Sequence, residues 1–148
     1  MRTLRLATAS RAGPGRHAVC AAALRWEDGA GRRVVIRRLR GGDPVPPAYR
    51  AVLLALGEAR RLRARAVVVG VDDADVAAQI AGRSAVPVQA LGGYLQVRAL
   101  LNVFRSAEIL YLTPACDPDA AAAASRVGAR ARSGQPSCTD LPLWAAAS

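Results

Sequence analysis

A chain of 148 residues has the length of one domain, and with 52% hydrophobic and 22% charged residues it is too apolar to stay disordered. No apolar stretch approaches the ~20 residues that cross a bilayer, and no signal-peptide pattern follows Met1, so we expect a cytoplasmic protein. The net charge of +10 comes from 21 arginines without any lysine, and 15 of them stand in residues 1–65 beside only 4 acids. This balance excludes an acidic surface there and favours polyanionic partners.

Three strands are predicted at the start of the chain. Polar and apolar residues alternate over residues 2–7, and a loop rich in Gly and Pro follows. Residues 18–26 and 32–40 form two further extended stretches, joined by turn residues at 27–31. We therefore expect an antiparallel meander.

Helices and strands alternate in the rest of the chain. Pro47 opens a helix with apolar residues at helical spacing up to Leu62, and the apolar run 66–71 predicts a central parallel strand. Helices are predicted at 76–81 and 94–104, a strand at 108–112, and an acid-capped helix from Asp117 to about residue 132. The order predicts an α/β fold, with a mixed five-stranded sheet in βββαβαβα order and helices on both faces. Residues 1–132 form the predicted domain, and 133–148 a tail.

Four stretches in chain order carry the motifs of a known family. Residues 7–15 fit an opening motif in which an acidic residue precedes small residues and a loop ends in Asn-Pro-Gly. Residues 48–56 fit a second motif at the start of a helix, in which Glu is followed by Tyr or Leu, then Arg, then Ala. Residues 71–82 fit a third motif, a strand that ends in Asp-Ser before a helix that ends in Gln-Leu-x-Gly. Residues 114–122 fit the motif of the last helix. Over residues 2–132 the sequence thus resembles the ribonuclease H family, especially its compact bacterial, reverse-transcriptase-like branch.

The resemblance implies an RNase H-like fold, and also an active site of which this chain retains one of four carboxylates. Such enzymes cut the RNA strand of RNA/DNA hybrids with two divalent metal ions, held by four carboxylates, one from each motif. When the four motifs are matched to this sequence, one carboxylate position is occupied by Asp72. The other three positions are occupied by alanines: Ala7, Ala48 and Ala122. One aspartate cannot hold two mutually repelling cations. We therefore expect a pseudoenzyme without a metal cofactor, with Mg or Mn needed only if the site is active.

Other acids near these motifs leave an alternative open. Asp73 and Asp75 follow Asp72, and Asp117 and Asp119 precede the last predicted helix, so a rearranged metal site would make the chain a metal-dependent RNase H. We favour helix capping as their role. Glu58 lies about 15 Å along the helix from Ala48 and cannot replace the missing Glu. The three cysteines and one histidine have no metal-ligand spacing, which predicts buried, inert thiols.

A nucleic-acid surface is predicted around the loop after the first strand and the start of the first helix. Glycines admit a phosphate backbone and guanidinium groups bond its oxygens in pairs. The candidate binding residues are Ser10, Arg11, Gly13, Gly15, Arg16, Arg50 and Asp73. With 4% aromatic residues, binding to an RNA/DNA hybrid or duplex should depend on charge and be sensitive to salt. The alternative is a scaffold module on the same core that binds a protein or a second copy of itself.

Overall fold

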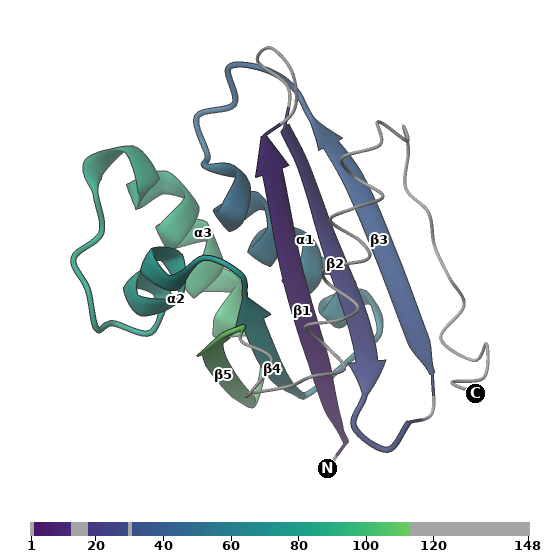
Figure 1. The fold of residues 1–148 in the computed structure, drawn as a ribbon. Coiled ribbons are helices and arrows are strands. Elements are labelled where there is room, and N and C mark those ends of the chain that lie inside the picture. Colours follow the sequence, from purple (N-terminus) through teal and green to yellow (C-terminus); the bar gives the residue numbers. More distant parts are fainter. Residues whose placement is uncertain (1, 13–17, 30, 113–148) are drawn as a thin grey trace.

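The computed structural model describes residues 2–12, 18–29 and 31–112, in which five strands form one mixed sheet. The strands are β1 (Thr3–Ala12), β2 (Ala18–Trp26), β3 (Arg32–Leu39), β4 (Ala66–Val71) and β5 (Ser106–Tyr111). Their order is β3-β2-β1-β4-β5; β1, β2 and β3 are antiparallel, whereas β4 and β5 continue the sheet parallel to β1 (Figure 1). The predicted mixed sheet and its antiparallel opening are confirmed.

The described helices pack against one face of this sheet. They are α1 (Pro47–Arg61), α2 (Ala74–Ile80), the short 3-10 helix η1 (Val88–Ala90) and α3 (Leu91–Leu101). Figure 1 shows α1 lying across the long strands, with α2 and α3 beside β4 and β5. One core joins them, because alternate residues of β1 and β4, such as Leu6 and Val69, belong to the same buried cluster as Tyr49 and Leu56 of α1. The helix expected to end near residue 132 and the 133–148 tail lie outside the described residues, so helices on both faces stay a prediction.

The second face of the sheet carries a smaller cluster of buried residues. It consists of Ala7, Ala9, Val19, Ala21, Ala23, Val34 and Ile36, with Leu112 packed against it. These residues alternate along β1, β2 and β3 with those that face the helices, as a pleated strand requires. The centre of the sheet therefore excludes water on both faces.

Some predicted element ends were wrong. Strand β1 was expected to end at residue 7 but continues to Ala12, because its ladder with β2 runs on from Ala7 opposite Ala23 to Ala12 opposite Ala18. Ser10 and Arg11 therefore belong to a strand and not to a loop. Helix α3 starts at residue 91 instead of 94, and β5 at 106 instead of 108. Within the described part of the chain, no helix is long and apolar enough to cross a membrane.

Candidate functional site

Asp72 lies directly after β4, where the adjacent parallel strand β1 also approaches its end. The backbone N–H of Ser10 donates a 3.3 Å hydrogen bond to Oδ2 of Asp72, across 62 residues of sequence. Below this contact, the buried Thr8 hydroxyl donates to the Gly70 carbonyl at 3.2 Å. In the sheet, β1 lies between β2 on one side and β4 on the other, and the chain continues from β1 into β2. Where the connections of a sheet diverge in this way, the carboxyl ends of the strands commonly form a binding site. The structure thus places Ser10 and Asp72 together at this position.

Two of the three alanines at which the resemblance implies carboxylates, Ala7 and Ala48, are buried. Ala7 lies opposite Gly70 in the β1–β4 register, two residues before the level of Asp72, and is 2% exposed. Ala48 is 7% exposed in the first turn of α1, where its methyl group belongs to the core. Because a methyl group offers no lone pair to a cation, these described residues do not fit a two-metal centre. Ala122 lies outside the described residues.

The acids beside Asp72 have a structural role at the start of α2. Asp73 is the N-cap, and its Oδ1 accepts a 3.1 Å hydrogen bond from the backbone N–H of Val76, which confirms helix capping for this residue. Asp75 is exposed in the first turn, where a negative charge favours the helix dipole. In the described ranges no group of three or more His, Cys, Asp or Glu side chains is arranged to hold a metal ion. Asp117 and Asp119 lie outside the described residues.

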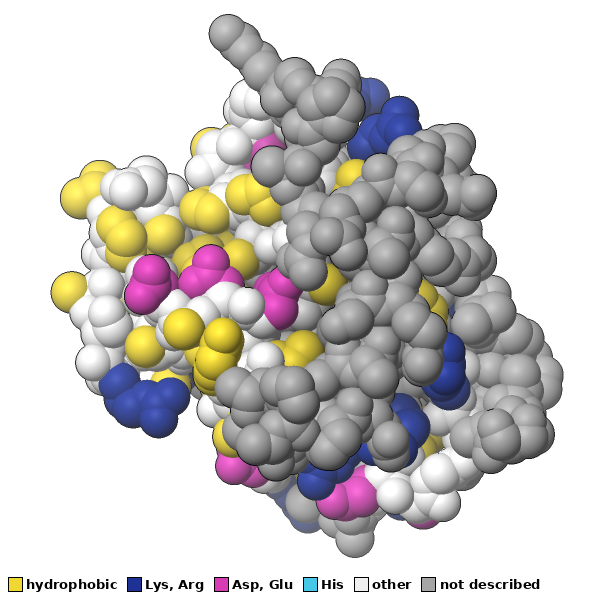
Figure 2. All heavy atoms as spheres, in the orientation of Figure 1, with side chains coloured by type: hydrophobic (Ala, Val, Ile, Leu, Met, Phe, Trp, Pro, Cys, Tyr) yellow, Lys and Arg dark blue, Asp and Glu magenta, His cyan; other side chains and the backbone are white. Residues whose placement is uncertain are grey.

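The surface over α2 carries negative charge, as Figure 2 shows. On this face of the molecule, acidic side chains gather in a short row over the region of α2, between hydrophobic ones. Phosphate groups are repelled by such a row when no cation lies between them. The surface over α2 is therefore unfavourable for an anion.

Arg50, predicted to bind nucleic acid, is held by a carboxylate of the preceding loop. Its Nε and Nη2 donate 2.8 Å hydrogen bonds to the two oxygens of Asp43, whose Oδ1 also accepts from the Val45 N–H at 3.0 Å. The hydrogen bond from Arg50, followed by that from Val45, holds the pKa of Asp43 below its usual value. The same pairing raises the pKa of Arg50. Arg50 thus lies near the predicted surface, but one edge of its guanidinium group is already bonded.

The sequence did not reveal this pairing, nor the others that involve acids of residues 1–65. Each of those four acids forms an ion pair with an arginine: Asp28 with Arg2, Glu27 with Arg5, Glu58 with Arg33, and Asp43 with Arg50. Glu58 is buried in α1 and also accepts from Arg61. Asp43 had a visible signal, because an aspartate after Gly41-Gly42 commonly bonds a backbone N–H two residues on.

Arginines at the end of the meander are exposed. Arg37 and Arg40, on and after β3, are exposed, and Arg37 shares a cross-strand row with Cys20 and Ser10. Arg11 belongs to β1, in register with Val19. Gly13, Gly15 and Arg16 lie outside the described residues.

Solved structures share this architecture. The N-terminal RNase H domain of a Mycobacterium tuberculosis protein superposes with a TM-score of 0.66 at 21% identity, over 84% of this chain and 96% of that one. RNase H1 from Halobacterium salinarum gives 0.67 at 18% identity, over 87% and 99%. The chain has the ribonuclease H-like fold. An RNase H1 named LC11, in complex with an RNA/DNA hybrid, gives 0.64 at 13% identity, over 90% and 98%. No family model and no curated protein matches the sequence.

In this RNase H-like domain the predicted residues fall into two groups. Asp72 and Ser10 meet at the strand ends, with Asp73 committed to the cap of α2. Arg50 lies in the first turn of α1 and is paired with Asp43. The first group carries carboxylates, whereas the charge of Arg50 is already compensated by Asp43.

Proposed function

We propose that this RNase H-like domain binds the backbone of an RNA/DNA hybrid or a nucleic-acid duplex and does not cleave it. The observation that carries the proposal is the environment of Asp72, whose partner positions for metal binding, Ala7 and Ala48, are buried methyl groups. Without two clamped cations, the attacking and leaving oxygens of a phosphodiester lack the charge that family members use. One structural neighbour was solved on an RNA/DNA hybrid, which supports nucleic acid as the partner class.

The arginine-rich meander is the proposed contact surface. Arg11 belongs to β1, Arg37 belongs to β3, and Arg40 follows β3 directly. Guanidinium groups on a strand surface contact phosphates without reading bases, and the low aromatic content leaves little for base stacking. Binding should therefore have little sequence preference and release counterions, with an affinity that falls steeply as salt rises.

The test is a titration of the full chain with a labelled RNA/DNA hybrid at low and moderate salt, with and without Mn, that reads binding and strand integrity together. Arg11→Ala and Arg37→Ala should weaken binding, whereas Arg83→Ala, which removes the same charge from the exposed loop after α2, should not. Binding with an intact strand supports the proposal. Mn-dependent cleavage that Asp72→Ala abolishes, or no binding at either salt, overturns it.

A second candidate is a protein-interaction module, and one observation favours it. Val88 in η1 is 88% exposed, and Leu91 and Leu95, four residues apart on α3, are 44% and 58% exposed. Apolar side chains gathered in this way commonly mark contact surfaces. Sedimentation of the full chain over a range of concentrations tests it: self-association that Leu95→Ser weakens, in a protein that binds no hybrid, would favour this candidate.

A further inference from the structure

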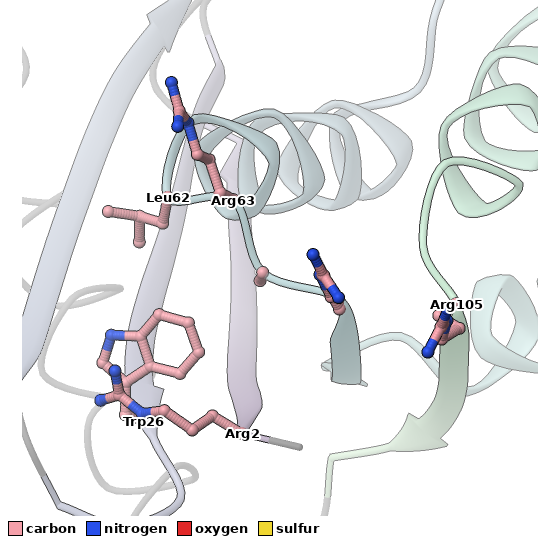
Figure 3. Close-up of a pocket in the computed structure, with 7 residues that line it drawn as sticks. Arg2, Trp26, Leu62, Arg63 and Arg105 are labelled. Carbon is pink, nitrogen blue, oxygen red and sulfur yellow. The ribbon is translucent and has the colours of Figure 1, made fainter.

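A hollow lies at the opposite end of β4 from Asp72. Arg2 precedes β1, Arg65 precedes β4 and Arg105 precedes β5, so three parallel strands begin at its rim. The hollow has a volume of about 400 Å³ and is also lined by Arg63 and Trp26. Figure 3 shows Arg2 against Trp26 on one side of it and Arg105 on the other. Strand β4 separates this end from Asp72 by six residues, or about 20 Å.

Backbone hydrogen bonds fix two of these arginines beside each other. The N–H of Arg105 donates to the carbonyl of Arg65 at 2.8 Å, and the N–H of Ser106 donates to the same carbonyl at 3.2 Å. The segments that lead into β4 and β5 are therefore joined before the strands begin. Their position does not depend on the arginine side chains, which leaves those side chains free to contact a ligand.

Arg63 occupies a backbone conformation that normally favours glycine. Its φ is +56°, directly after α1. The N–H of Arg63 bonds to the Arg60 carbonyl at 2.9 Å and that of Ala64 to the Ala59 carbonyl at 3.1 Å, which is the Schellman arrangement. Glycine would end the helix here without steric cost, whereas arginine costs stability. Such strain is often found where a side chain has a function.

The charges around the hollow are only partly compensated. Arg2 is bonded to Asp28 at 2.9 Å and covers the Trp26 ring, with its guanidinium carbon 4.3 Å from the ring centroid. Within the described part of the chain, no ion pair is formed by Arg63, Arg65 or Arg105. Like charges gathered without counter-charges repel one another, so binding of an anion is favoured.

We propose that this hollow binds a ligand that carries two or more phosphate groups. Guanidinium groups bond phosphate oxygens in pairs, and arginines on three sides of the hollow suit several phosphates better than one. Because Arg2 already covers the Trp26 ring, contacts with phosphate contribute more than stacking of a base. The phosphates of a free nucleotide and those of a nucleic-acid strand share this chemistry. The site is separate from the hybrid-binding surface proposed above and does not depend on it.

Calorimetric titration with inorganic tripolyphosphate at low salt tests the site in the full chain. Arg63→Gly is the most informative variant, because it removes the side chain and relieves the strained backbone, so its thermal stability should not fall. We expect Arg63→Gly and Arg105→Ala each to weaken binding roughly threefold or more. Arg83→Ala, with the same loss of charge elsewhere, should bind as the unmodified protein does. No binding of tripolyphosphate, or an equal loss in Arg83→Ala, overturns the proposal.

Two further titrations distinguish the source of the phosphates and separate this site from the hybrid surface. A single-stranded oligonucleotide without a terminal phosphate that displaces tripolyphosphate, and binds Arg63→Gly more weakly, identifies a nucleic-acid backbone. An oligonucleotide that does not compete identifies a free polyphosphate ligand. Arg11→Ala should leave tripolyphosphate binding unchanged; a loss as large as that in Arg63→Gly would place the phosphates on the meander and overturn the separate site.

Discussion

The phenol of Tyr49 donates a 2.7 Å hydrogen bond to Oε1 of Gln79 inside the core and so joins α1 to α2. Tyr49 is fully buried, and desolvation is the main cause that raises its pKa to about 12. Both residues belong to stretches that carry the family resemblance, residues 48–56 and 71–82. Two of the motifs therefore meet in a structural contact and not in a catalytic one.

Tyr49→Phe should destabilise the protein and change how its stability depends on pH. At neutral pH we expect a loss of about 1–3 kcal/mol, because the buried Gln79 oxygen loses its donor. In the unmodified protein the folded state keeps the phenol proton up to a pKa of about 12, whereas the unfolded state loses it near 10.0. The unfolded state thus binds fewer protons in this window, and stability falls as pH rises through it.

Urea unfolding near neutral pH and at about pH 11 measures both effects. The difference in unfolding free energy between the unmodified protein and Tyr49→Phe should be smaller at the higher pH. Tyr94→Phe, a change at a partly buried tyrosine, is the control. A difference that stays constant across this range would contradict the assigned pKa.

Gly93 sets how closely α3 packs on α1. A Cβ atom at this position would lie 2.9 Å from Cγ1 of Val45 and 3.1 Å from Cβ of Tyr49. Gly93→Ala should therefore cost about 1–3 kcal/mol through overpacking, although alanine is the better helix former. Gly92→Ala is the matched control in the same helix, because nothing lies within 4 Å of its Cβ. It should raise stability by up to about 1 kcal/mol, and thermal unfolding of the pair measures both.

Much of the fold was predictable because burial leaves a pattern in the sequence. Strand β4 is covered on both sides, so it appears as a continuous apolar run, and its predicted bounds of 66–71 agree with the structure. Pro47 marks the start of α1 as expected. The end of β1 was not predictable in this way, because residues 8–12 are small or polar and their strand conformation depends on pairing with β2.

The contacts of the candidate site were less predictable, because they join distant parts of the chain. Ser10 and Asp72 are 62 residues apart, and Arg33 and Glu58 are 25 apart. Composition shows an excess of arginine but not which arginines are neutralised. Only the register of the strands and the position of α1 determine these pairs.

Arg33 should matter for stability more than other arginines of β3. Its Nη1 donates to Oε2 of Glu58 at 3.2 Å, and the Glu58 side chain is only 7% exposed. Arg33→Ala leaves that buried carboxylate with Arg61, whose side chain is largely exposed. We expect a loss of about 1–3 kcal/mol in chemical unfolding, against less than about 0.5 kcal/mol for the exposed Arg37→Ala.

A variant that replaces both Arg33 and Glu58 distinguishes the loss of their ion pair from the loss of side-chain packing. Because much of the cost comes from a buried charge without its partner, Arg33→Ala combined with Glu58→Met should be more stable than Arg33→Ala alone. A double variant whose losses simply add would show that the two side chains do not interact.

The Asp43–Arg50 pair should stabilise the protein only where Asp43 is ionised. Arg50 holds the pKa of Asp43 below its usual 3.8, so the folded state binds fewer protons than the unfolded state in acid. This contribution is complete well above pH 3.8 and is lost as pH falls through the lower folded-state pKa. Asp43→Asn should therefore cost about 1 kcal/mol at neutral pH, with a difference that shrinks in acid.

The same variant tests whether Arg50 contacts nucleic acid. In the folded protein both oxygens of Asp43 bond Arg50 at 2.8 Å, so a phosphate must compete with a carboxylate for its guanidinium group. Asp43→Asn removes that competitor and one negative charge, and hybrid affinity at low salt should rise. Asp75→Asn, which removes the same charge from the exposed start of α2, is the control. An equal gain in both variants would mean that the change acts through net charge alone and that Arg50 does not bind the phosphate backbone.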